Sequence, residues 1–527
     1  MEASAGTPWR PRANPWAIAV VVALAAFMEV LDTSIANVAL PHMAGSLGAS
    51  SDQSTWILTS YLVSNAIVLP ITGWFAGVFG RRRFFMTCLA AFTLSSLLCG
   101  VAPSLNAIIF FRVLQGAGGG GLQPMAQAIL ADTFPPEKRG VAFAVFGVTT
   151  VLAPVIGPTL GGWITDNYSW RWIFSINLPV GIVAMILVLR LVEDPPWAKR
   201  AAGGGVSIDY VGVGLLVLGV GALQIMLDKG QEEDWFGSTF ILALAVTAAV
   251  GLVSLVVWEW FQDHPIVEVR LYRNVNFLGT SAMIFVLGIM LFASLVLMPQ
   301  FLQSLVGYSA ESAGLVLSGG GLMLVLLFPI VGTLAGRVQA RYLIAFGWLA
   351  LCLAMAYSAQ HLDREISFWS ASLLRVTQVV GLPFLFVPIN LAAYVGMPVE
   401  KSNSVAGLMN FMRNMGSGIG TSMVTTLVAR GAQFHQVHLV AHVTPAQPSF
   451  RQAASVLAAR LTHAGLEAGD AARHAYALLY RAVIGQATTL AYIDTFWVLA
   501  AGAGLMFLLS FALQGNDPRG AAPAAVH

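Results

Sequence analysis

Long apolar runs separated by short polar segments recur along the whole chain. A helix needs about 20 mostly apolar residues to cross the hydrocarbon core of a bilayer. Fourteen segments meet this requirement, and we predict a membrane-spanning helix in each of them: 16–37, 54–79, 84–103, 106–132, 140–165, 170–192, 208–228, 237–261, 276–304, 311–336, 341–361, 366–397, 402–430 and 490–514. The pattern therefore predicts an all-α membrane protein.

The first apolar run also allows a second interpretation, because Arg10 and Arg12 precede a run that starts near Trp16. A basic segment followed by an apolar one is typical of a secretory signal peptide. Here the run continues well past the length of such a peptide and then carries acidic residues. This favours a first membrane-spanning helix.

The lysines and arginines are divided unequally between the connecting segments. Fifteen lie in the tails and loops on one side of the predicted bilayer, and the short loops on the other side hold only Arg171, Lys229 and Arg364. Positively charged residues are enriched in cytoplasmic loops. We therefore expect both termini and the loop with Arg81, Arg82 and Arg83 to be cytoplasmic.

One exterior segment, 431–489, is much longer than the others. Its middle, 450–484, is rich in alanine and has Val456, Leu457 and Leu461 at helical spacing. This periodicity predicts a helical hairpin outside the membrane. The alternative is a mobile, solvated loop.

Two sequence patterns recur eight predicted helices apart. Residues 73–83 resemble 332–341, and 112–124 resemble 375–388; chance similarity between apolar helices is the alternative explanation. The repeats predict two six-helix bundles with two inserted helices, an architecture typical of secondary transporters. The expected organisation is an N-terminal tail 1–15, a first bundle 16–192, an insert 193–275, a second bundle 276–514 that includes 431–489, and a C-terminal tail 515–527.

Composition narrows the class of protein. The 527 residues are 57% hydrophobic and only 10% charged, with a mean hydropathy of +0.76. A soluble domain has about 45–50% apolar and about 25% charged residues. These values exclude a soluble globular enzyme, a disordered chain and a disulfide scaffold. The net charge of +2 gives no indication of a nucleic-acid partner.

No pattern of an enzyme appears in the sequence. None of the four lysines follows a glycine, so the phosphate-binding loop of nucleotide hydrolases is missing. The cysteines lie in apolar runs, and no His, Cys or acidic cluster has the spacing of metal ligands. We therefore expect no metal or other cofactor and no enzymatic activity. We expect the proton gradient to be the energy source. The alternative is a membrane-embedded enzyme or sensor.

Glu29 and Asp32 lie in the first predicted helix, and Arg112 lies in the fourth. A charged side chain at the centre of a bilayer costs about 2.5 to 3.5 kcal/mol on insertion scales, so such residues usually face a bundle interior and have a function. At about 1.5 Å per residue, Asp32 and Arg112 each lie within about 10 Å of the outer boundary and can meet. We predict that Asp32, tuned by Arg112, carries the transported proton, with Glu29 as a second titratable group. A static ion pair is the alternative.

Glycine and proline are concentrated in the fourth and fifth predicted helices. The run Gly118 to Gly121 indicates a tight helix crossing or a flexing point. The fifth helix carries Gly147, Pro154, Gly157, Pro158, Gly161 and Gly162, of which the prolines disturb its hydrogen bonds and Gly157 and Gly161 form a small-residue face. Ordinary helix packing is the alternative for this face.

A broad apolar pocket is expected between the two bundles. Polar side chains within the spans are candidates for its lining: Gln115, Gln123, Gln127, Asn390, Asn410 and Arg413. Arg413 lies near mid-membrane with no acidic residue in its own helix. It could face Glu29 across the interface, meet an anionic substrate or have a structural role.

With these features the chain resembles the major facilitator superfamily, and within it the fourteen-helix drug:proton antiporters of the EmrB/QacA type. The similarity covers nearly the whole chain. Four segments carry this similarity. Residues 31–41 are similar to the first-helix motif of that group, and Gly73 to Arg83 are similar to the cytoplasmic loop motif, in particular at Gly73, Gly80 and Arg81 to Arg83. Residues 112–116 are similar to the fourth-helix motif linked to proton coupling, and 147–162 are similar to the antiporter motif. The segments 223–230 and 234–236 and the long exterior segment resemble the EmrB branch of the group.

This resemblance implies proton-driven export of hydrophobic, chemically varied toxic compounds from a bacterial inner membrane. It also implies two partners, a periplasmic membrane-fusion adaptor (EmrA-type) and an outer-membrane channel (TolC-type), with 431–489 as the surface that binds the adaptor. The alternative function is proton-coupled import or export of one defined solute. One position departs from the family pattern: Gly77 stands where the loop motif usually has an acidic residue that is thought to lock the outward-facing state.

Overall fold

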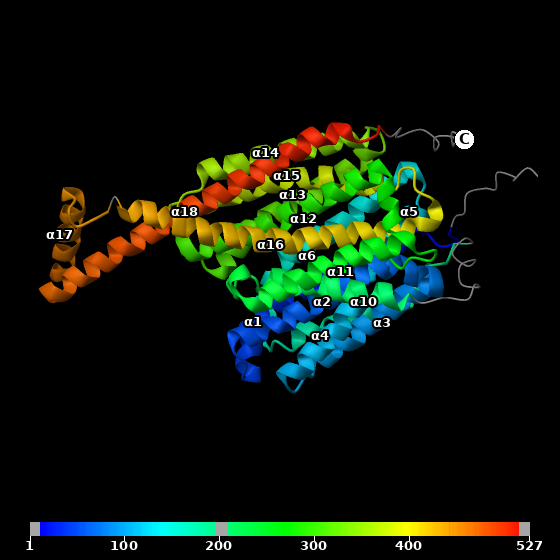
Figure 1. Cartoon of the computed structure of the whole chain (residues 1–527), viewed down its shortest axis with the longest axis horizontal. Coiled ribbons are helices and arrows are strands. Elements are labelled where there is room, and N and C mark those ends of the chain that lie inside the picture. Colours follow the sequence, from blue (N-terminus) through cyan, green and yellow to red (C-terminus); the bar gives the residue numbers. More distant parts are fainter. Residues whose placement is uncertain (1–10, 196–208, 442, 516–527) are drawn as a thin grey trace, which may run out of the picture.

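The computed structural model describes residues 11–195, 209–441 and 443–515, and within these ranges it contains helices and no strand (Figure 1). The predicted all-α fold is confirmed. Most of the two predicted tails lies outside the described residues.

The first half of the chain forms a bundle of long helices. Asn14 caps the first of them, since its side chain accepts a hydrogen bond from the Trp16 amide, and Gly48 ends it in a left-handed conformation with φ 63°. The elements are α1 (Pro15–Leu47), α2 (Ser51–Phe79), α3 (Arg81–Gly100), α4 (Leu105–Gly119), α5 (Leu122–Thr133), α6 (Pro136–Asn167), α7 (Trp172–Ser175) and α8 (Asn177–Leu191).

Two helices stand between the halves, α10 (Tyr210–Lys229) and α11 (Thr239–Phe261), joined by a turn that includes the short helix Trp235–Gly237. They pack against each other, and α10 also contacts α2 and α16 (Ser402–Ala441). The inserted pair therefore lies against both halves of the molecule.

The second half repeats the bundle. Its first helix, α12 (Val275–Phe301), continues into a π-helical turn, Leu302–Val306. The others are α13 (Ala310–Ala335), α14 (Ala340–His361), α15 (Phe368–Ala393), α16, α17 (Pro448–His463) and α18 (Ala468–Leu509).

All fourteen predicted spans fall on helices, but not every one is a single apolar rod. Twelve helices among the described residues are long and apolar enough to cross a membrane. The predicted span 106–132 is broken into α4 and α5 at Gly120 and Gly121, and the continuous helix α16 contains many Ser, Asn and Gly residues, which make it less apolar. The count of fourteen spans stays a prediction.

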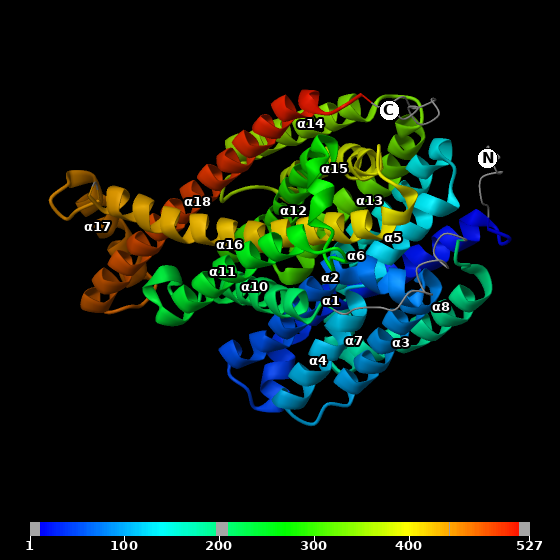
Figure 2. The ribbon, with the colours of Figure 1, turned by 45° about the vertical axis from the view of Figure 1, so that its right-hand side comes forward.

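The two ends of the molecule differ (Figures 1 and 2). The start of α1 and the end of α18 lie at one end, here called the terminus end. At the opposite end, the α17 end, α16 and α18 extend beyond the other helices and carry α17 (Figure 2).

The long exterior segment is therefore helical throughout most of its length. The predicted helix start at 490 is wrong, because α18 already begins at Ala468 and runs without interruption to Leu509. The sequence 468–489 is rich in alanine, a strong helix former, and has no proline to stop the helix.

At the terminus end the two halves are in backbone contact. A Cβ atom on Gly73 of α2 would lie 2.7 Å from the Cα of Ser404 in α16. On the other side, a Cβ on Gly140 of α6 would lie 2.5 Å from the carbonyl oxygen of Gly332 in α13. Only glycine permits both approaches, so the molecule is closed at this end.

Candidate functional site

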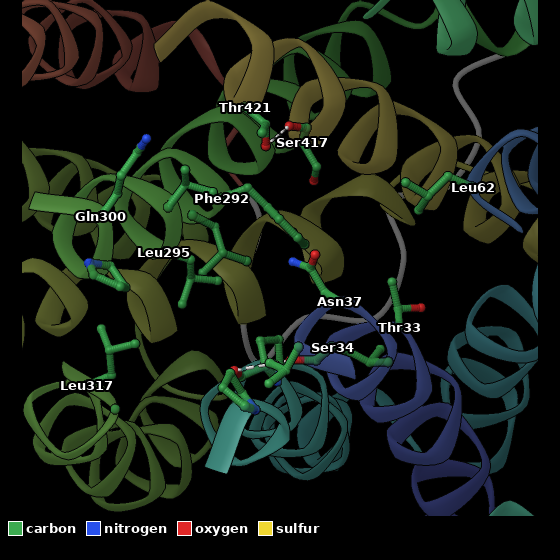
Figure 3. A pocket seen from close by; sticks show the side chains of 18 of the residues that line it. Thr33, Ser34, Asn37, Leu62, Phe292, Leu295, Gln300, Leu317, Ser417 and Thr421 are labelled. Carbon is green, nitrogen blue, oxygen red and sulfur yellow. Dashed lines mark hydrogen bonds between the residues drawn. The ribbon is translucent and has the colours of Figure 1, made fainter. Parts of the chain in front are cut away.

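A large cavity lies between the two halves, with a volume of about 1520 Å³. Its wall is formed by parts of α1, α2, α5, α6, α10, α12, α13 and α16, and it includes His42, Asp166 and Glu311, which lie at the ends of their helices toward the α17 end. The cavity therefore opens toward the α17 end. Figure 3 shows Ser34 and Asn37 of α1 facing Phe292 and Leu295 of α12 across this space.

Glu29 lies in the cavity wall and is 4% exposed. Its carboxylate accepts hydrogen bonds from the Tyr61 hydroxyl and the Asn65 amide, both at 3.0 Å, and from the Gln123 amide. Gly119 makes room for this cluster, because a Cβ there would lie 2.7 Å from the Tyr61 hydroxyl oxygen. The carboxylate is thus both held in place and reachable from the cavity.

A chain of polar side chains runs from Glu29 into the other half. Gln123 donates to Glu29 and accepts a hydrogen bond from the guanidinium of Arg413. Arg413 also donates to the Asn410 side-chain oxygen at 2.8 Å, and the Asn410 amide donates to Gln127 at 2.8 Å. Arg413 and Glu29 do face one another across the interface, but Gln123 lies between them.

Asp32 is buried behind the cavity wall, 2% exposed, and does not line the cavity. Its carboxylate accepts a hydrogen bond of 2.6 Å from Arg112, and further bonds from the amides of Gln115 at 2.9 Å and Asn177 at 2.7 Å. These partners come from α4 and α8. Asp32 therefore ties three helices of the first half together.

Arg112 is fully buried and lies over the Tyr61 ring, 4.2 Å from its centroid. It also donates to the Ile57 carbonyl at 3.1 Å. Because Tyr61 contacts both the Arg112 cation and the Glu29 carboxylate, the two acidic sites share a neighbour.

The antiporter motif brings α6 against α1. Pro158 has no N–H to donate to the Pro154 carbonyl, and the Ser34 hydroxyl donates to that carbonyl instead, at 3.4 Å. Gly157 permits this approach, since a Cβ there would lie 2.3 Å from the Ser34 hydroxyl oxygen.

The other three glycines of this motif have different neighbours. Gly161 also faces α1 at Ile35, Gly147 faces Phe328 of α13, and Gly162 has no atom closer than 4.0 Å to its Cβ position. The motif therefore packs α6 against helices of both halves.

The loop motif lies at the closed terminus end. The buried Arg81 forms an ion pair with Asp132 of α5, and Asp132 also accepts a hydrogen bond of 3.3 Å from Ser402, the first residue of α16. This carboxylate connects the two halves. The position of Gly77 is open, with no atom within 4 Å of its Cβ position.

The rest of the loop motif shapes the turn before α3. Gly80 has a φ of 83°, which favours glycine. The Arg82 amide donates to Asp194 at 2.7 Å, its guanidinium donates to the Leu189 carbonyl, and Arg83 is exposed.

The predicted lining residues fall into two groups. Gln123 and Arg413 line the cavity, whereas Gln115, Gln127, Asn390 and Asn410 are buried among the helices and do not. The amide of Asn390 donates to the Phe386 carbonyl of its own helix at 2.7 Å. These four residues lie within the helix packing rather than facing the cavity.

Sequence reasoning missed Tyr61, Asn65 and Asn177. Each is a polar side chain inside an apolar helix, and Tyr61 and Asn65 are four residues apart on one face of α2. That spacing was the available signal.

Among the described residues, no group of His, Cys, Asp or Glu side chains could hold a metal ion.

Comparison with known proteins agrees with this architecture. Residues 22–421 match the family model of the Major Facilitator Superfamily. The chain is 38% identical over 501 residues to the multidrug export protein EmrB of Haemophilus influenzae, covering 94% of this chain and 95% of that protein. It is 36% identical over 471 residues to the fatty acid resistance protein FarB of Neisseria gonorrhoeae, covering 88% and 89% of the two chains.

Among solved structures, the fold is similar to that of the proton:xylose symporter XylE. The TM-score is 0.59 at 12% identity, and the match covers 96% of this chain and 97% of the other. From the family match and the extent of these similarities, the chain belongs to the major facilitator superfamily of membrane transporters, in the group that includes the EmrB proteins.

Proposed function

We propose that this chain is a proton-driven exporter of hydrophobic toxic compounds in the inner membrane of a bacterium, with the terminus end in the cytoplasm. The observation that carries the proposal is the cavity of about 1520 Å³ with the Glu29 carboxylate in its wall. The cavity is large enough for drug-sized molecules and presents mostly apolar surface with a few polar groups, as binding sites for such molecules do. The names of the relatives support multidrug export as the activity.

In this proposal the structure represents the state that releases substrate and takes up protons. A proton entering from the α17 end reaches Glu29 through the open cavity. Protonation removes the negative charge that accepts hydrogen bonds from Tyr61, Asn65 and Gln123. Because Gln123 also holds Arg413, the contact between the halves changes with the charge on Glu29.

Asp32 and Arg112 form the second proton-coupling pair of the proposal. Their ion pair is excluded from water, so a proton that reaches Asp32 releases Arg112 and loosens α1 from α4. The static alternative assigns the pair to packing alone. The two ideas differ in whether a neutral residue at position 32 still permits coupled transport.

The proposed partners are a periplasmic adaptor and an outer-membrane channel. The extension formed by the ends of α16 and α18 together with α17 is the proposed adaptor surface. It exposes large apolar side chains, among them Phe434, Val437, Tyr476 and Tyr480, and exposed apolar surface of this kind marks interaction sites.

The function is tested by expressing the chain in a bacterial strain that lacks its own drug pumps, with and without the adaptor. Resistance to several unrelated hydrophobic compounds, abolished by a proton uncoupler, supports the proposal. Resistance to one compound class only would instead support the alternative of a single defined solute. Everted vesicles give the direction, since drug added outside must accumulate inside when the vesicle interior is acidified.

The adaptor surface is tested by a shortened chain. Gln436 and Tyr480 are in hydrogen-bond contact at 3.3 Å, so residues 437–479 can be replaced by a short Gly-Ser linker without moving α16 or α18. We expect this variant to fold and to transport in vesicles but to lose co-purification with the adaptor. Undiminished adaptor binding would remove the extension from the proposal.

A further inference from the structure

The inserted helix α10 has a polar face in an otherwise apolar sequence. Gln224 and Asp228 lie four residues apart and line the cavity together with Leu227, and Gln231, in the turn that follows the helix, also lines it. Residues with this spacing lie on one side of a helix. The inserted pair is therefore not confined to the periphery, because α10 supplies part of the cavity wall.

The end of α10 is attached to α2 in the first half. The Thr59 hydroxyl donates to the Asp228 carboxylate. The next residue, Lys229, is 4% exposed and donates to Thr55 and to Glu232. Asp228 and Lys229 therefore hold α10 on α2 through two separate contacts.

The same segment is attached to α16 in the second half. The Ser422 hydroxyl donates to the Leu227 carbonyl, and the Trp235 indole donates to the Thr426 hydroxyl at 3.0 Å. Thr426 donates in turn to Gln231 at 3.0 Å. The end of α10 thus bridges α2 and α16 and closes the side of the cavity between them.

Gln224 provides an acceptor without a donor. Its side chain is 5% exposed and lines the cavity, where a Cβ on Gly418 of α16 would lie 3.5 Å from the Gln224 amide atoms. Its side-chain oxygen has no hydrogen-bond partner among the described residues. A buried acceptor left unpaired is unfavourable, so this atom is suited to a donor brought by a ligand.

The charges of the cavity favour a cation at this place. Near the mouth the lining carries the carboxylates of Asp166, Asp228 and Glu311. The described lining has one Arg or Lys, Arg413, and its guanidinium is held by side chains deeper in the site. A cavity with carboxylates on apolar walls concentrates cations.

We propose that Gln224 and Asp228 form a subsite that binds the positively charged head of hydrophobic amines. The ammonium donates one hydrogen bond to the Gln224 oxygen and one to the Asp228 carboxylate, which lies one helical turn further along the same face. The apolar part of the ligand packs against Leu227 and Phe292, and the Phe292 ring also attracts the cation. This proposal rests on the proposed function, because it names a substrate class for the same cavity.

Three naphthalene compounds with different heads test the subsite: 1-naphthylmethylammonium, (1-naphthylmethyl)trimethylammonium and 1-naphthylacetate. Binding to the full chain in lipid nanodiscs is measured by calorimetry. We expect the wild type to bind both cations at least about tenfold more tightly than the acetate. We expect the first amine to bind best, since only it has N–H groups.

Two substitutions separate the roles of the subsite residues. Asp228→Asn should weaken the binding of both cations about tenfold or more, since hydrogen bonds to charged groups are the stronger class. It should leave the affinity for the acetate unchanged. Gln224→Leu should weaken the binding of the primary amine several-fold and leave the affinity for the trimethylammonium compound unchanged. Glu233→Gln is the control, because Glu233 is an exposed neighbour in the following turn that does not line the cavity.

The subsite is overturned if the wild type shows no preference for cations, or if Asp228→Asn weakens the acetate as much as the amine. It is also overturned if Asp228→Asn behaves like Glu233→Gln, provided that thermal unfolding shows all variants to be folded. The proposed function fails separately, if the wild type confers resistance to no compound of any charge. Resistance that is retained but insensitive to position 228 rejects the subsite alone.

Discussion

Glu29 and Asp32 lie one helical turn apart, yet they have different surroundings. Glu29 contacts uncharged donors and the cavity, whereas Asp32 contacts a buried cation and no part of the cavity. A carboxylate that is reachable from solvent can exchange a proton in this state, and one that is sealed behind it needs a conformational change first. Under the proposed function, the two residues therefore take part in proton coupling in a fixed order.

Replacing Glu29 by Gln should abolish substrate-driven proton release while leaving substrate binding within a few-fold of wild type. The amide keeps the shape of the side chain and most of its hydrogen bonds but cannot carry the proton. The measurement is the pH change on adding substrate to weakly buffered, detergent-solubilised protein. Glu365→Gln, an exposed carboxylate far from the cavity lining, serves as the control, and normal proton release by Glu29→Gln would contradict the assignment.

Replacing Asp32 by Asn should give a folded protein that is less stable and inactive in coupled transport. Breaking a buried ion pair from one side costs about 3 to 5 kcal/mol, because Arg112 is left buried without its counter-charge. Thermal unfolding measures the first effect and vesicle transport the second. Adding Arg112→Gln should restore much of the stability but not the transport; recovery of both would identify a purely structural pair.

At the scale of the helix, α6 stays continuous through Pro154 and Pro158, and α1 replaces the hydrogen bond that Pro158 removes. Ser34 donates to the freed carbonyl, and Gly157 allows the close approach. This part of the antiporter motif thus forms a contact between α6 and α1.

Gly157→Ala should lower both the melting temperature and the transport rate, since the new methyl group would lie 2.3 Å from the Ser34 hydroxyl oxygen. Overpacking of this kind costs about 1 to 3 kcal/mol. Gly162→Ala, in the same motif but with its nearest atom at 4.0 Å, should behave like wild type. Equal effects of the two substitutions would contradict the packing role.

Sequence patterns predicted the positions of the helices along the chain well, but they did not predict which side of each helix faces its neighbours. Counting residues from the helix ends placed Asp32 and Arg112 at one depth, and the structure joins them at 2.6 Å. In a helix that is apolar on all sides, periodicity gives no indication of which face meets a neighbour. For this reason Gln123 between Glu29 and Arg413, and Asp228 in the cavity wall, could be identified only from the structure.

At the scale of the whole molecule, the terminus end is closed by one acidic residue as well as by glycine contacts. Asp132 is bound to Arg81 in its own half and to Ser402 in the other. The acidic residue at this contact is therefore Asp132 of α5. The loop motif itself has no acidic residue at its usual place, where this chain has Gly77. Loss of this charge should favour opening at the terminus end.

The test uses Ser404→Cys in a background with Cys352→Ser, because Cys88 and Cys99 are buried. Ser404 lies against Gly73 at the closed end, so maleimide should label it slowly in everted vesicles. Adding Asp132→Asn should raise the labelling rate several-fold. Asp363→Asn, at an exposed position in the loop between α14 and α15, should not change it, and equal rates in all three proteins would rule out the closing role.

One helix, α16, takes part in all three regions of the molecule. It begins at Ser402 in the closed contact, passes Arg413 in the cavity wall and continues into the extension beyond the bundle. Its 40 residues contain no proline and span about 60 Å at the usual rise per residue. If opening at the terminus end tilts this rigid helix, its far end is displaced as well, so the adaptor proposed to bind the extension would be pulled or pushed in every transport cycle.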